Sequence, residues 1–216
     1  MKRKIAPYQI VYEDQDILVV NKQREVFSIR TKDKRTYAHN LYHYLYEYLE
    51  KKKERPYIVH RLDYETSGLI IFAKSKVLKD SLQSAFEKRQ VIRRYEAVIE
   101  ERIEPGLHWE IKQYLSSNGK GGMVYETDPS SGKEAITHLT SANQIQIGTV
   151  LSITIETGRR AQIRKAIQSL GFHLLGDKKY SQSEAKRMYL NAYSLTFPED
   201  MPIQKKNFEV KPLWLL

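Results

Sequence analysis

Apolar positions along the chain fall into short strand-like runs and longer helix-like runs, with no internal repeat. Two runs rich in β-branched and aromatic residues flank the stretch Glu13-Asp14-Gln15-Asp16, and this pattern predicts a β-hairpin. A third run, Leu69-Ile70-Ile71-Phe72-Ala73, is short and continuous, as is typical of a buried strand. The predicted strands are residues 8–12, 17–21, 69–73, 94–100 and 151–155.

Three longer segments have the apolar spacing of helices. They cover residues 36–53, residues 75–89 and residues 160–170, with Ser75 as a cap for the second and Gly171 as a stop for the third. The apolar face of the first helix is predicted to consist of Leu41, Leu45 and Leu49. Turns are predicted at residues 116–122 and 128–132.

Composition limits the class of protein. The 216 residues fit one large domain or two small ones, of which a single domain over 1–216 is taken here, and they carry a formal net charge of +10. Such a surplus favours a polyanionic partner, although many basic proteins have none, and the 15 Tyr, six Phe and two Trp residues provide stacking surfaces. The absence of Cys excludes disulfides and thiolate chemistry. No membrane span and no secretory signal are expected, so a cytoplasmic location is predicted.

Two further patterns could indicate a nucleotide site or a metal site, but their spacing does not fit either. The stretch 116–122 contains Lys and Gly without the spacing of a phosphate loop, which argues against nucleotide triphosphate binding. His39 and His43 are four residues apart, but they lack the Glu of the zinc-protease pattern. They are interpreted as surface histidines, and no metal site is predicted.

The most informative segment runs from His60 to Lys74. Asp63 lies two residues after Arg61, before a Thr-Ser-Gly turn and a buried strand, so its carboxylate is expected on a loop held by rigid structure. A surface ion pair between Arg61 and Asp63 is the simpler interpretation of that triplet. The full pattern, His-Arg-Leu-Asp-x-x-Thr-Ser-Gly-Leu-x-x-Phe-Ala-Lys, resembles the signature of the RluA family of RNA pseudouridine synthases. The resemblance implies that Asp63 is the catalytic residue.

A second cluster, basic in character, follows the strand at 151–155. Residues 157–164, Thr-Gly-Arg-Arg-Ala-Gln-Ile-Arg, resemble the family motif Thr-Gly-Arg-x-His-Gln-Ile-Arg, and Gly176-Asp177-Lys178-Lys179-Tyr180 resembles its Gly-Asp-x-x-Tyr. The resemblance implies that Arg164 pairs with Asp63. A solvated basic helix face is the alternative. A phosphate-binding patch would be formed by Arg159, Arg160 and Gln162.

Further matches extend over nearly the whole chain. Tyr95, in Arg94-Tyr95-Glu96-Ala97, matches the tyrosine that stacks on the target base, with a core tyrosine as the alternative, and Leu190 matches an apolar wall of the pocket. By the same resemblance Arg61 fills the space left by the flipped base, and Lys74 is assigned to substrate binding. The chain departs from the family pattern at Gln23, Ala161 and Asn191, and it has no residues to spare for the separate N-terminal S4 domain of some relatives.

The resemblance implies an α+β fold, with a mixed, mostly antiparallel bent sheet and peripheral helices around a central RNA-binding cleft. It also implies isomerisation of specific uridines in structured RNA, ribosomal or transfer, by a monomer. Isomerisation neither adds nor removes atoms, so no cofactor is needed, and one carboxylate acting as nucleophile or base suffices. A non-catalytic RNA-binding protein with the same fold is the alternative function.

Overall fold

The structure is a computed structural model whose chain divides into two compact units. It describes residues 6–31, 34–119 and 122–212. Unit 1 combines Met1–Val91 with Ala192–Leu216, and unit 2 is the continuous stretch Ile92–Asn191 between them. The expectation of a single catalytic domain over the whole chain stays a prediction.

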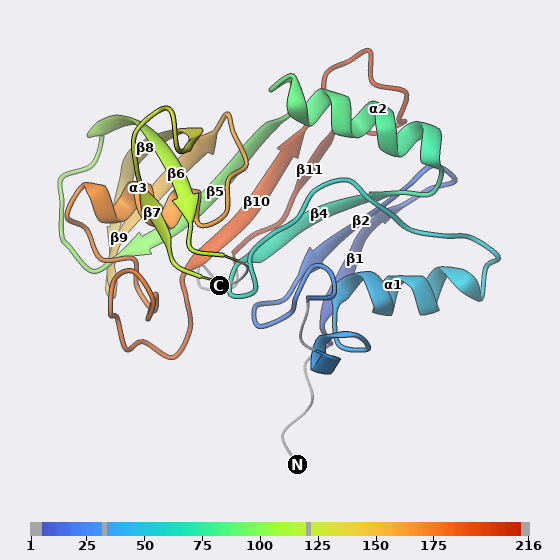
Figure 1. Ribbon diagram of the computed structural model, residues 1–216, viewed down its shortest axis with the longest axis horizontal. Coiled ribbons are helices and arrows are strands. Elements are labelled where there is room, and N and C mark those ends of the chain that lie inside the picture. The colour runs from blue at the N-terminus through green and yellow to red at the C-terminus, as the bar shows by residue number, and fades with distance from the viewer. Residues whose placement is uncertain (1–5, 32–33, 120–121, 213–216) are drawn as a thin grey trace. The chain divides into compact units, whose positions relative to one another are not determined.

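Unit 1 is built on a sheet with strand order β1-β2-β4-β10, in which β3 also pairs with β4 and β11 with β10 (Figure 1). Its elements are β1 (Tyr8–Glu13), β2 (Ile17–Lys22), the 3-10 helix η1 (Lys34–Thr36), α1 (Leu41–Glu50), β3 (Tyr57–Ile58), β4 (Ser67–Ala73), α2 (Lys76–Glu87), β10 (Leu190–Thr196) and β11 (Asn207–Glu209). The predicted hairpin is confirmed, because β1 and β2 pair antiparallel.

The core of unit 1 surrounds β2 and β4. Every residue of both strands is buried, so both faces of the sheet are covered. In Figure 1, α2 lies above these strands and α1 below them. Ile71 of β4 packs in one hydrophobic cluster with Leu82 of α2 and Phe208 of β11. The continuous apolar run predicted to be a buried strand is therefore confirmed.

Unit 2 consists of an antiparallel sheet and one helix. Its elements are β5 (Ile92–Ile99), β6 (His108–Ser117), β7 (Val124–Glu126), β8 (Lys133–Ile145), β9 (Gly148–Ile155) and α3 (Gln162–Ser169). The strand order is β5-β9-β8-β6-β7, and every pairing in this series is antiparallel. The α+β class with mostly antiparallel strands is thereby confirmed, and the central RNA-binding cleft stays a prediction.

Helix boundaries differ from the sequence-based expectation at both ends of α1. The helix begins at Leu41 rather than at residue 36, because Asn40 accepts a hydrogen bond from the His43 N–H and acts as the N-cap. It ends at Glu50, so Lys51–Lys53 follow the helix and do not form its last turn. The predicted apolar face is confirmed, since Leu41, Leu45 and Leu49 have no exposed surface.

The other two helices are shorter than predicted. The Ser75 hydroxyl accepts a hydrogen bond from the Leu78 N–H, which confirms the predicted cap of α2. α3 begins at Gln162, because Ala161 before it has the left-handed backbone conformation (φ 52°). Gly171 has φ 76° directly after the end of α3, as predicted for a helix stop.

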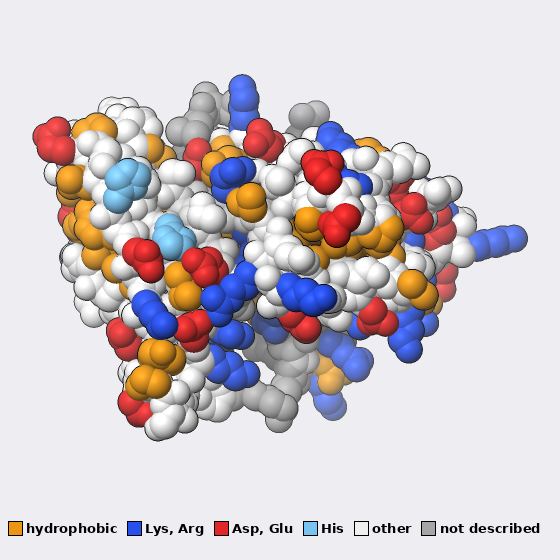
Figure 2. Space-filling view, turned by 90° about the horizontal axis from the view of Figure 1, so that it is seen from above, with side chains coloured by type: hydrophobic (Ala, Val, Ile, Leu, Met, Phe, Trp, Pro, Cys, Tyr) orange, Lys and Arg blue, Asp and Glu red, His pale blue; other side chains and the backbone are white. Residues whose placement is uncertain are grey.

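The surface charge is interspersed. On the face shown in Figure 2, Lys and Arg side chains lie among Asp and Glu side chains. Some cations are thus partly neutralised by neighbours, for example Lys52 by Glu13. None of the helices in the described part of the chain has the length and apolar content that crossing a lipid bilayer requires.

Candidate functional site

Asp63 lies in unit 1, on the loop that joins β3 to β4. The loop closes with a hydrogen bond from the Thr66 N–H to the Asp63 carbonyl oxygen at 3.2 Å, and the Asp63 side chain is half-buried. Gly68 follows, with φ 120°, and a Cβ atom there would lie 2.2 Å from the Ala192 carbonyl oxygen. Only glycine allows β4 to begin so close to β10, which explains the Gly of the Thr-Ser-Gly turn.

The residues on both sides of Asp63 are fixed by the last residue of β2 and by the segment that follows it. The Ser28 hydroxyl donates to the Leu62 carbonyl oxygen at 2.7 Å and accepts from the Leu62 N–H at 3.1 Å. Lys22 Nζ donates to the Tyr64 carbonyl oxygen at 3.3 Å. The loop backbone is therefore held at the residue before Asp63 and at the residue after it.

Lys22 is the least expected residue of this site. Its side chain has no exposed surface, and Nζ also donates to the carbonyl oxygens of Gln23 (2.9 Å) and Val26 (2.8 Å). Burial lowers the pKa of Lys22 to about 7, while the negative charge of Asp63 acts in the opposite direction. Three carbonyl acceptors match the three N–H donors of an ammonium group, so the local geometry favours the charged form.

His60, at the start of the matched segment, has a positioning role. Its Nε2 atom accepts a hydrogen bond from the Ile71 N–H at 3.2 Å, and its ring stacks on Phe86 of α2 with centroids 4.7 Å apart. Since a backbone N–H can only donate, Nε2 carries no proton in this arrangement. His60 thus ties the approach to Asp63 to both β4 and α2.

Lys74, at the end of the segment, is bound by two carboxylates. Its side chain is only 6% exposed, and Nζ lies 2.9 Å from Glu13 and 2.7 Å from Glu54. Burial alone would raise the pKa of Glu13, but hydrogen bonds from Lys52, Lys74 and Tyr48 lower it to about 2. This network joins β1, β4 and the end of α1. A role of Lys74 in substrate binding stays a prediction.

Arg164 lies in unit 2, on α3, and forms a bidentate ion pair with Asp177. Nε is 2.7 Å from Oδ2 and Nη2 is 2.5 Å from Oδ1, and both side chains are buried. The guanidinium also lies 4.7 Å from the centre of the Tyr180 ring. Asp177 in turn accepts hydrogen bonds from the N–H groups of Lys179 and Tyr180. The pairing of Arg164 with Asp63 stays a prediction.

The remaining predicted residues are in unit 2, except Arg61 in unit 1. Gln162 is buried, and its amide makes four hydrogen bonds within the unit, to Thr157, to the Arg159 N–H, to Ile136 and to Thr137. These four bonds use the full capacity of the amide, so Gln162 holds α3 against β8.

Two arginines of the predicted basic cluster, Arg159 and Arg160, come shortly before Gln162 in the chain. Arg159 is exposed and donates through Nε to the Glu134 carbonyl oxygen, and Arg160 binds the Gly122 carbonyl oxygen. Tyr95 on β5 is 7% exposed, opposite Ile153 of β9, and Leu190 is buried at the start of β10. Arg61 is exposed on the Asp63 loop of unit 1. The substrate contacts of these residues stay predictions.

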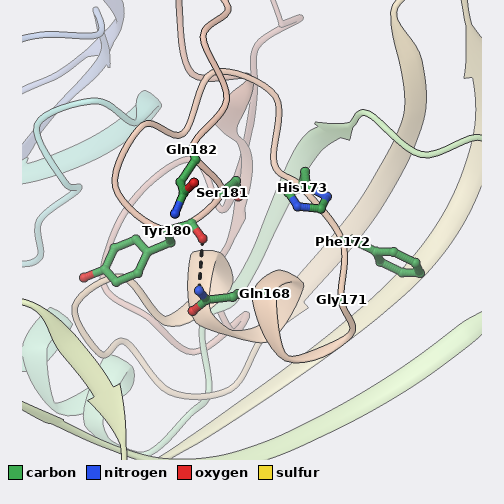
Figure 3. Close-up of a pocket in the computed structure, with 7 residues that line it drawn as sticks. All are labelled: Gln168, Gly171, Phe172, His173, Tyr180, Ser181 and Gln182. Atoms are coloured by element: carbon green, nitrogen blue, oxygen red, sulfur yellow. Dashed lines mark hydrogen bonds between the residues drawn. The ribbon is translucent and has the colours of Figure 1, made fainter.

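A polar pocket of about 280 Å³ opens beside the end of α3 (Figure 3). It is lined by Gln168, Gly171, Phe172, His173, Tyr180, Ser181 and Gln182. Gln168 Nε2 donates to the Tyr180 carbonyl oxygen, and the Tyr180 hydroxyl accepts from the Val124 N–H. Tyr180 therefore lines the pocket and also contacts Arg164. None of the predicted catalytic or substrate-binding residues lines it.

The sequence did not assign a role to four residues that shape these sites, namely Lys22, Ser28, Asp177 and Tyr180. Asp177 and Tyr180 fall within the segment Gly176-Asp177-Lys178-Lys179-Tyr180 matched to the family, so the resemblance marked their positions without their function. Ser28 carried no signal, because its partner Leu62 is distant in sequence.

Residues 16–169 match the family model described as RNA pseudouridylate synthase. Two curated proteins similar to the chain are both named ribosomal large subunit pseudouridine synthase D. The one from Vibrio cholerae serotype O1 is 35% identical over 177 residues, which cover 81% of this chain and 53% of that protein. The one from Zymomonas mobilis is 31% identical over 184 residues, covering 82% and 57%. The chain thus spans about half the length of these relatives.

Two solved human structures resemble the fold. RNA Pseudouridylate Synthase Domain Containing 4 aligns with a TM-score of 0.73 at 19% identity, covering 94% of this chain and 88% of that one. RNA Pseudouridylate Synthase Domain Containing 1 aligns with a TM-score of 0.68 at 23% identity, covering 94% and 82%. At these identities the two structures establish the similarity of fold.

Proposed function

Since the chain belongs to the RNA pseudouridylate synthase family, we propose that it converts specific uridines of structured RNA into pseudouridine, with Asp63 as the catalytic residue. The names of the similar curated proteins favour ribosomal RNA of the large subunit as the substrate class. We propose that both units together form one catalytic domain, which acts as a cytoplasmic monomer.

The observation that carries the proposal is the fixation of the Asp63 loop. Ser28 binds both polar backbone groups of Leu62, and buried Lys22 binds the carbonyl oxygen of Tyr64. A loop backbone fixed on both sides of Asp63 loses little freedom when substrate binds, and it needs little reorganisation during the reaction. A catalytic carboxylate requires a loop that is fixed in this way, whereas a surface ion pair does not require it.

The reaction matches a single carboxylate. The bond between C1′ and N1 breaks, the uracil turns, and C1′ bonds to C5, while C5 loses a proton and N1 gains one. Ionised Asp63 acts as nucleophile or as base at the sugar. Lys22 lies close enough to interact electrostatically with Asp63.

A uridine within folded RNA must leave its stack to reach a pocket of this kind, at a cost of a few kcal/mol. In the proposed complex, Tyr95 and Leu190 hold the flipped base, Arg61 enters the space that it leaves, and Arg164 faces Asp63. Arg159, exposed at the start of the basic cluster, binds phosphate. These roles rest on the family resemblance of their positions.

The substitution Asp63→Asn tests the proposal. It removes the charge and keeps the shape of the side chain, so we expect RNA affinity to persist and pseudouridine formation to stop. The measurement is pseudouridine mapping of ribosomal RNA from cells that express either form, with RNA binding of each purified form. Asp80→Asn, which removes an exposed carboxylate from α2, is the matched control.

Activity that survives in Asp63→Asn would exclude the catalytic assignment. If the wild-type protein binds RNA and no pseudouridine depends on it, the alternative function, a non-catalytic RNA-binding protein, replaces the proposal.

A further inference from the structure

An exposed aromatic side chain lies directly after the proposed catalytic residue. Tyr64 is 41% exposed, and its ring rests against Phe27 with centroids 4.4 Å apart and planes inclined by 35°. Phe27 is partly buried and forms the inner member of the pair. One ring thus supports the other and leaves the outer face of Tyr64 accessible.

The pair is anchored through its backbone. The carbonyl oxygen of Tyr64 accepts from buried Lys22, and the carbonyl oxygen of Phe27 accepts from the Leu41 N–H at 2.8 Å, at the first residue of α1. Both anchors belong to the core of unit 1. An aromatic surface held in this way offers contact area at a small cost in conformational entropy.

The local charges select the kind of partner. Burial, together with the carboxylates of Glu25 and Glu65, raises the pKa of Tyr64, so its hydroxyl stays neutral. Two carboxylates near the ring repel phosphate, but they do not repel an uncharged aromatic group. Arg61, which precedes Asp63 in the loop, is exposed and can bind a phosphate group of the same RNA strand.

We propose that the Phe27–Tyr64 pair is a stacking platform for the nucleobase next to the uridine that Asp63 attacks. The inference rests on the proposed function for its placement. Tyr64 directly follows Asp63, so their Cα atoms are about 3.8 Å apart. A base next to the uridine held at Asp63 is therefore the one that the Tyr64 ring is placed to receive. Stacking accepts any base, so the platform supplies affinity and orientation without sequence readout.

The test uses a single-stranded RNA of about twelve nucleotides that contains one uridine with 2-aminopurine on its 5′ or its 3′ side. Stacking on an aromatic ring quenches the fluorescence of this base. Binding is measured in the Asp63→Asn background, so that turnover does not contribute. We compare Tyr64→Ala, Tyr64→Phe and Tyr46→Ala, the last of which removes a tyrosine of similar exposure (36%) from α1.

We expect quenching at one of the two positions, which Tyr64→Phe keeps and Tyr64→Ala loses together with at least about 5-fold in affinity. Tyr46→Ala should leave both unchanged. Equal quenching and affinity in Tyr64→Ala and its parent would overturn the platform. If the quenching depends on Tyr64 while the wild-type protein forms no pseudouridine, the proposed catalysis fails and the platform stands.

Discussion

Lys22 is fully buried, and a buried ammonium is stable only where other groups replace its water. Here three carbonyl oxygens and the charge of Asp63 do so. The same residue thus fixes the Asp63 loop through Tyr64 and interacts electrostatically with Asp63. A fold that buries a cation at this point gains a positioned carboxylate at some cost in stability.

The lowered pKa of Lys22, about 7, predicts a dependence of stability on pH. Between this value and the ordinary lysine pKa of about 10.4, the unfolded chain binds a proton that the folded chain lacks. Stability should therefore rise with pH across this window, by up to about 1.4 kcal/mol per unit. The gain is lost as pH falls through 7.

Lys22→Met removes the titrating group and should flatten this part of the profile. The measurement is the free energy of unfolding in urea for both forms at several pH values between about 6 and about 10. Parallel profiles would contradict the lowered pKa of Lys22, because they would mean that the folded protein keeps this proton over the whole range.

Arg164 provides the second prediction at this scale. Arg164→Ala should strongly reduce turnover if Arg164 faces Asp63, but it also leaves buried Asp177 without its ion pair, which typically costs about 3–5 kcal/mol. The double variant Arg164→Ala/Asp177→Asn separates the two effects, because Asn keeps an acceptor for the Lys179 and Tyr180 N–H groups. We expect the double variant to regain stability and to stay slow.

Turnover is measured as pseudouridine formed per enzyme, and stability by urea unfolding. An unchanged rate in Arg164→Ala would mean that Asp63 has another partner. Recovery of both rate and stability in the double variant would assign Arg164 a purely structural role.

At the scale of elements, the sequence predicted the presence of helices and strands better than the residues at which they begin and end. The strands of unit 1 and the buried face of α1 follow from apolar spacing, which is a local signal. The start of α1 depends on Asn40, which has both its cap bond to His43 and side-chain bonds to the carbonyl oxygens of Thr36 and Tyr37. The apolar spacing extends past such a cap, so it placed the helix start too early.

The same contrast between local signals and long-range contacts holds for the Asp63 site. Asp63 was predicted from a contiguous motif, whereas the bonds from Ser28 and Lys22 to its loop join segments far apart in sequence. The burial of Lys22 arises from tertiary packing, and no property of the sequence around residue 22 distinguishes it from a surface lysine.

The start of β4 yields a prediction about backbone packing. Gly68→Ala should destabilise the protein severely, because the new Cβ would lie 2.2 Å from the Ala192 carbonyl oxygen, in addition to the strain of φ 120°. Gly106→Ala is the matched control, since Gly106 has φ 88° and open space around it. Its cost should reflect strain alone, about 1–2 kcal/mol. Urea unfolding of both variants checks this, and equal costs would contradict a close approach of β4 and β10.

At the scale of the whole molecule, the net charge of +10 predicts salt-sensitive RNA binding. Phosphate contacts release counterions, so affinity should fall steeply with salt, and each lost contact should reduce the slope of log affinity against log salt by about 0.7 to 0.9. Arg159 is exposed and has no carboxylate partner among the described residues, so Arg159→Ala should lower the slope.

Lys52→Ala changes the net charge equally but removes a cation already paired with Glu13, so its slope should match the wild type. Binding of labelled RNA over a salt series provides the measurement. A similar change in slope for both variants would indicate a general effect of net charge in place of a defined contact.

The division of unit 1 into two stretches of chain has a consequence for synthesis. β10 and β11 complete the sheet beside β4, yet they leave the ribosome after all of unit 2. Unit 2 is continuous and can fold as soon as it emerges, whereas the fully buried strand β4 must wait for β10. During this interval the edge of β4 is open to pairing with other chains. A nascent chain halted before β10 should therefore recruit chaperones that the completed protein no longer binds.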